Sequence, residues 1–124
     1  MRLIAKLATV VVAGTAAVAT LTAPAQAAGG TKYCPVSSNL EPWCDLQLYP
    51  TRFPGGTISI DVDVSGSNPV VGHWTLYIDG GSVCGADFAY SDPPRSWVCR
   101  NVRAGYPTLS VPRGYEAARI GLRW

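Results

Sequence analysis

Hydrophobic and polar residues alternate along several short stretches of the chain. In TISIDVDV (57–64), every second residue is a branched aliphatic one, and serine or aspartate lies between them. A period of two places successive side chains on opposite faces of a β-strand, so this stretch predicts a strand with one buried and one solvated face. Similar patterns occur in WCDLQLYP (43–50), HWTLYID (73–79), residues 84–88, SWVCRNVR (96–103), PTLSVP (107–112) and EAARIGLRW (116–124).

Residues that favour turns separate these stretches. Glycine, proline, asparagine and aspartate gather in TRFPGG (51–56), SGSNP (65–69) and DGG (79–81). No stretch has the period of an amphipathic helix. The sequence therefore predicts an all-β fold, a small disulfide-stapled antiparallel β-sandwich of six to seven strands, with a distorted barrel as the alternative.

The DGG turn also predicts a register. A three-residue loop, Asp79 to Gly81, pairs Leu76 with Cys84 and Trp74 with Ala86, so Cys84 and Phe88 face the core. A two-residue loop of Gly80 and Gly81 would turn both outward. We therefore predict the three-residue loop, with a glycine in the left-handed region.

The first 27 residues have the pattern of a secretory signal peptide. Arg2 and Lys6 precede an apolar stretch, LATVVVAGTAAVATL, which is too short to span a bilayer comfortably. Small residues follow at the cleavage positions Ala25 and Ala27. We predict cleavage after Ala27 and a secreted, extracellular protein with no membrane contact in its mature form; an uncleaved anchor is the alternative.

The remaining chain has the length of one domain. We expect a flexible N-terminal arm at 28–33 and a single β-sandwich domain at 34–124. All four cysteines lie in that domain, and an even number in an exported chain predicts disulfides. Of three connectivities we predict the sequence-local one, Cys34–Cys44 and Cys84–Cys99, because short loops are easily closed. The spacings do not fit a zinc site.

The charges are balanced but unevenly distributed. Two of the ten basic residues lie in the signal segment, so the remainder equals the eight acidic ones. Acidic residues dominate 28–92, whereas 93–124 contains six arginines and only Glu116. A net charge of zero argues against a nucleic-acid partner. We expect paired strands to bring the two halves together, so that opposite charges meet across them.

The sequence offers little for catalysis. His73 is the only histidine, it falls on the polar side of a strand, and no nucleophile motif accompanies it. Asp61 and Asp63 share a strand face and could in principle serve a glycosidase or bind calcium, but a solvated face is the commoner arrangement. We predict no catalytic residue, no metal, no cofactor and no enzymatic activity.

Binding has better support. The chain has twelve aromatic residues, of which Trp74, Trp97 and Trp124 fall on predicted core faces. Cys84 and Cys99 lie at equivalent heights on two strands, so their bond is expected to staple a hairpin whose tip is SDPPRS (91–96). Tyrosine and arginine are enriched at interfaces, and loops on rigid scaffolds carry binding residues. The predicted binding residues lie in this loop and in the arm: Tyr90, Asp92, Pro93, Pro94, Arg95 and Tyr33.

The signal peptide, the preference for arginine over lysine and the stapled strands are similar to those of small exported proteins of filamentous actinomycetes, which include protease and amylase inhibitors. In plan, the chain also resembles the adaptor subunits of secreted umbrella-shaped toxin particles, which share export, a short β-sandwich and a free N-terminal arm. That resemblance implies a non-catalytic subunit that binds other secreted proteins; no motif carries over, so it assigns no site residue. The alternatives are an inhibitor that offers residues 91–96, with Arg95, to a trypsin-like protease, and a carbohydrate-binding module.

Overall fold

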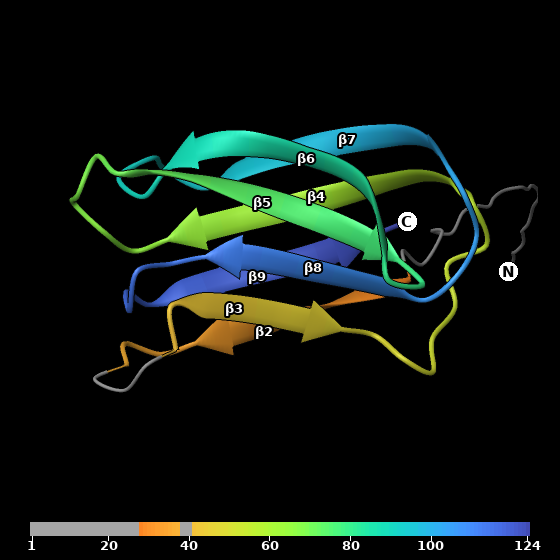
Figure 1. Ribbon diagram of the computed structural model, residues 1–124, viewed down its shortest axis with the longest axis horizontal. Helices are drawn as coiled ribbons and strands as arrows, with labels where there is room; N and C mark the ends of the chain where they lie inside the picture. Colours follow the sequence, from red (N-terminus) through yellow and green to blue (C-terminus); the bar gives the residue numbers. More distant parts are fainter. Residues whose placement is uncertain (1–27, 38–40) are drawn as a thin grey trace, which may run out of the picture.

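The computed structural model describes residues 28–37 and 41–124, which form eight β-strands and no helix (Figure 1). The strands make two four-stranded antiparallel sheets. One sheet has the order β2 (Gly29–Cys34), β9 (Ala118–Arg123), β4 (Gly56–Val64) and β7 (Arg95–Val102). The other has the order β3 (Trp43–Gln47), β8 (Pro107–Pro112), β5 (Val71–Ile78) and β6 (Gly81–Ala89). The all-β sandwich is thus confirmed, with eight strands where six or seven were predicted.

The core lies between the two sheets and follows the predicted alternation. On β4, the four aliphatic side chains that alternate with polar ones are buried. From β5, Trp74 is fully buried and lies against Trp97 of the opposite sheet, with ring centroids 5.3 Å apart. Trp124 is partly buried and packs edge-on against Phe53. These contacts confirm that the three tryptophans face the core.

Both predicted disulfides are present, but the expected stapled hairpin is wrong. Cys84 lies on β6 and Cys99 on β7, and these strands belong to different sheets. The chain crosses the side of the sandwich between them, so the bond joins two edge strands instead of two paired ones. The Cys34–Cys44 bond likewise joins the edge strands β2 and β3 at the opposite side of the sandwich. Each open side of the sandwich is therefore closed by one disulfide.

The hairpin between β5 and β6 has the predicted register through a different turn. Leu76 pairs with Cys84, as expected, but the loop consists of two residues, Asp79 and Gly80, with φ values of 50° and 84°. Two consecutive left-handed residues match the twist of the flanking strands. An irregularity between Leu76 and Tyr77 then leaves Val83 as an extra residue on β6 and restores the register.

The expected flexible arm at 28–33 is also corrected. From Gly29 onward this segment forms β2, which pairs with β9 over its whole length. The ladder continues through Ala28, which exchanges two backbone hydrogen bonds with Trp124 at 2.9 and 3.0 Å. The backbone of β9 would otherwise lack a partner on that side, and pairing satisfies it. The predicted signal peptide, residues 1–27, lies outside the described residues.

Two disulfides indicate an oxidising, extracellular environment. Across residues 28–37 and 41–124, no helix has the length and apolar character needed to span a membrane.

Candidate functional site

A hollow of about 410 Å³ opens on the outer face of the β2-β9-β4-β7 sheet. The register of the strands explains where it forms. Thr31, Gly121, Asp61 and Ser96 lie in one row across the four strands. Gly121 has no side chain and is buried in this row, where an added Cβ would come within 3.1 Å of Thr31 Cγ2 and 3.6 Å of Asp61 Oδ2. The hollow is lined by Thr31, Asp61, Val62, Asp63, Pro94, Arg95, Ser96, Arg119, Ile120 and Gly121.

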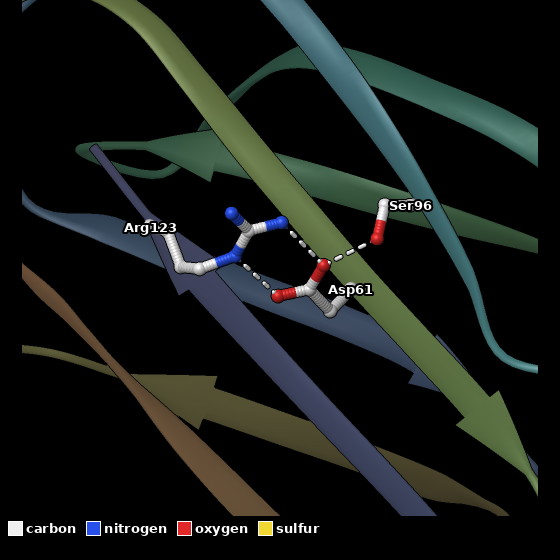
Figure 2. A network of polar contacts seen from close by, with 3 residues as sticks. All are labelled: Asp61, Ser96 and Arg123. Carbon is white, nitrogen blue, oxygen red and sulfur yellow. Dashed lines mark hydrogen bonds and ion pairs between the residues drawn. The ribbon is translucent and has the colours of Figure 1, made fainter. Parts of the chain in front are cut away.

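Asp61, which lines the hollow, is held by a polar network (Figure 2). Arg123 donates to both carboxylate oxygens, from Nε at 2.7 Å and from Nη2 at 2.8 Å, and the Ser96 hydroxyl donates to Oδ1. The hydrogen bonds from Arg123 lower the pKa of Asp61, against partial desolvation, which raises it. The network confirms that acidic and basic halves of the chain meet across paired strands.

Asp63 and Arg119 lie one row away, directly opposite each other on β4 and β9. Among the described residues no ion pair joins them to each other or to a third group. The Arg119 guanidinium instead lies over the ring of Tyr33, 5.1 Å from its centroid. Tyr33 itself is 54% exposed. A carboxylate and a guanidinium therefore face the hollow with their charges available to a ligand.

The loop between β6 and β7 forms another side of the hollow. Asp92 accepts hydrogen bonds from the Ala89 backbone amide at 2.9 Å and from Arg95 at 3.1 Å. These bonds, led by the one from Ala89, lower the pKa of Asp92. The Arg95 guanidinium also lies 4.6 Å from the centre of the Trp97 ring. The loop thus fixes Arg95 at the start of β7 and does not project it.

Tyr90, one of the predicted binding residues, does not line the hollow. Its ring is partly buried against the core, 5.8 Å from the Phe88 ring, and burial raises its pKa. The ring also lies next to Gly72 and Gly114, where an added Cβ would approach it within 2.9 and 2.8 Å. Two glycines thus make room for Tyr90, which supports the loop from beneath.

The structure brings together parts of the two segments that the sequence singled out. Pro94 and Arg95 line the hollow directly, and Asp92 positions Arg95. Tyr33 borders the hollow through its contact with Arg119. Pro93 is exposed next to Pro94. The sequence alone assigned Asp61 and Asp63 to a solvated face, and it did not predict Arg119, Gly121 or Thr31 at this site. Only the strand register places them there, although the alternation in 116–124 already put Arg119 on the outward face.

His73 lies outside this hollow. Its Nδ1 is 2.7 Å from Asp87 Oδ1 on the neighbouring strand, and both side chains are exposed. Its Nε2 lies against Gly85, where a Cβ would come within 2.6 Å. In the described part of the chain no hydroxyl hydrogen-bonds to His73, and no group of three metal-ligating side chains occurs.

The site has fixed walls, a carboxylate and a guanidinium that form no ion pair within the described part of the chain, and an exposed tyrosine against which that guanidinium lies. Such an arrangement can bind a polar ligand by charge-assisted hydrogen bonds and ring contacts. The chain matches no protein-family model and no curated protein.

Proposed function

We propose that this protein is a secreted, non-catalytic binding module that holds another secreted protein in the hollow on the β2-β9-β4-β7 face. The observation that carries this proposal is the meeting of β2 and the 90–94 loop at one hollow. Both borders are held firmly: β2 by its pairing with β9 and by Cys34–Cys44, and the loop by Asp92 and Cys84–Cys99. Rigid borders reduce the entropy that binding would otherwise remove.

The residues at the hollow suit a polar protein segment. Arg119 and Asp63 offer charges of both signs, so an incoming loop with a carboxylate and a cationic or amide group would find a partner for each. Tyrosine and arginine are the residue types that most often anchor protein interfaces. We further propose that the module acts as an adaptor, which joins other proteins in a multi-subunit, toxin-like complex.

The position of Arg95 favours this reading over a protease inhibitor. A substrate-like inhibitor must extend one side chain into the specificity pocket of the protease. Arg95 is instead paired with Asp92 and lies over Trp97, and both contacts would have to break. The alternative of carbohydrate binding has a similar difficulty. Arg119 covers one face of the Tyr33 ring, so a sugar could stack only on the other face.

The proposal can be tested by capture from the medium of the cells that secrete the protein. Tagged mature chain is compared with Arg119→Ser, Asp63→Ala and the control Arg100→Ser, which removes an exposed arginine of β7 outside the hollow. We expect one secreted protein to be retained by the parent and the control and lost by both hollow variants. Retention by all four, or by none, would reject the hollow as a protein-binding site.

A further inference from the structure

A buried arginine lies at the end of the molecule where the β2–β3 and β8–β9 connections meet. Arg113 is 4% exposed, and no carboxylate pairs with it among the described residues. Its guanidinium donates instead to three backbone carbonyls: Trp43 from Nε at 3.2 Å, and Pro35 and Glu116 from Nη1, the latter at 2.9 Å. A planar, fully charged fork of donors is suited to such multiple bonding. Arg113 thus ties three chain segments together.

Each of these carbonyls belongs to an exposed apolar residue or to its neighbour. Val36 follows Pro35 and is 71% exposed; Trp43 is 48% exposed; Tyr115 precedes Glu116 and is 40% exposed. The Ser37 amide also donates to the Tyr115 carbonyl at 3.0 Å. Cys34–Cys44 closes the same connection covalently. We call Val36, Trp43 and Tyr115 the Arg113 corner.

Tyr115 adopts a backbone conformation that its side chain disfavours. Gly114 and Tyr115 have φ values of 54° and 71°, within a turn closed by the Glu116 amide and the Arg113 carbonyl at 2.9 Å. A left-handed φ is unusual for a bulky residue and is normally left to glycine or asparagine. The Tyr115 ring is not part of the core that the described residues form, so core packing does not offset this strain. Strained residues of this kind concentrate at binding sites.

The charges around the corner are mainly negative. Glu41, Asp45 and Glu116 lie on the same segments, and within 35–37, 41–45 and 113–117 the only cation is the buried Arg113. The nearby Lys32 is tied to the Asp45 carbonyl at 2.8 Å. A partner with an apolar centre and basic residues around it would therefore complement this surface in both hydrophobicity and charge.

We infer that the Arg113 corner is a second docking surface, which binds a protein that presents an apolar patch rimmed by lysine and arginine. It shares no residue with the hollow and does not depend on the function proposed for it. Pre-positioned aromatic side chains with a polar rim have the anatomy of an interaction hot spot.

The test uses two synthetic amphipathic peptides with identical leucine and tryptophan positions, one with lysine and one with glutamate at all polar positions. Each is titrated into ¹⁵N-labelled mature protein, and the Trp43 indole and Gly114 and Tyr115 amide signals are followed by NMR. We expect the lysine peptide to shift these signals and to bind at least about tenfold more tightly than the glutamate peptide.

Tyr115→Asn separates binding from folding. Asparagine tolerates the left-handed conformation, so the variant should melt at or above the parent temperature and bind the lysine peptide at least about tenfold more weakly. Tyr49→Ser removes another exposed tyrosine, at the far end of β3, and should bind like the parent. Equal binding of the two peptides, unchanged binding by Tyr115→Asn, or shifts centred on the hollow would overturn the proposal. Self-association that is lost in Tyr115→Asn would assign the surface to a second copy and overturn it equally.

Discussion

Cys84 and Cys99 are bonded across the side of the sandwich, from the edge strand of one sheet to the edge strand of the other. Cys34 and Cys44 form the matching bond on the opposite side. The two sheets are therefore fastened to each other along both edges. Because the 90–94 loop begins on one sheet and ends on the other, this arrangement fixes the loop relative to the hollow it borders.

Removing the Cys84–Cys99 bond should loosen one side of the molecule. We expect Cys84→Ala/Cys99→Ala to lower the free energy of unfolding by about 3 kcal/mol, because the bond closes a loop with a sequence separation of 15. Urea denaturation measures this change. Amide exchange should rise in β6 and β7 and stay slow in β2, whereas a rise spread evenly over all strands would contradict the edge-fastening role.

The Asp61–Arg123 pair should stabilise the protein above acidic pH only. The folded-state pKa of Asp61 lies below that of an unfolded aspartate, which is about 3.9. The contribution of the ion pair to the free energy of unfolding is therefore fully present at pH values above the unfolded pKa. It is lost as the pH falls toward the lowered pKa of the folded state. Asp61→Asn should therefore be less stable than the parent at pH 7, by about 0.5–1 kcal/mol for a pair this exposed. Urea denaturation from pH 7 to pH 2 should show the two proteins converging; a constant difference would exclude the ion pair as its source.

Tyr90 and Arg95, neighbours on the same loop, should respond differently to truncation. Tyr90→Ala removes a ring that packs against Phe88 and the core, so we expect a loss of about 2 kcal/mol and a melting temperature about 10 °C lower. Arg95→Ala removes exposed contacts and should change the melting temperature by only a few degrees. Calorimetry of the two variants distinguishes them, and equal melting temperatures would show that Tyr90 does not support the loop.

Arg113 should be difficult to replace. Arg113→Met fills a similar space but removes the donor to three carbonyls, and we expect a loss of at least about 2 kcal/mol in the free energy of unfolding. Arg113→Lys keeps the charge without the planar fork and should recover only part of that loss. Full stability in Arg113→Lys would mean that the charge alone is sufficient.

Local patterns in the sequence were enough to predict much of the fold. Strict alternation identified β4, β5 and β9, and the short spacings identified both disulfides. The sequence of residues 90–94, however, is compatible with either a hairpin or a crossing between sheets, because the choice depends on which strands pair elsewhere. Likewise β2 has no strong pattern of its own and forms because β9 offers it an edge.

The hollow could be predicted only in part. Arg95 and Pro94 were found because prolines and a disulfide mark their loop. Gly121 and Thr31 could not be predicted in this way, because they matter only through their positions in the same row as Asp61. That row becomes visible only when the register of three strands is known.

Site-specific cross-linking can show whether a secreted protein is bound in the hollow. The photoreactive residue p-benzoylphenylalanine is placed at Pro93, which is exposed beside the hollow, or at Thr108 on the outer face of the other sheet. After irradiation in the native medium, we predict that the Pro93 variant forms one discrete cross-linked species, that Arg119→Ser abolishes it, and that the Thr108 variant forms none. Cross-links from Thr108 alone, or cross-links from Pro93 that persist in Arg119→Ser, would show that the hollow is not the binding site.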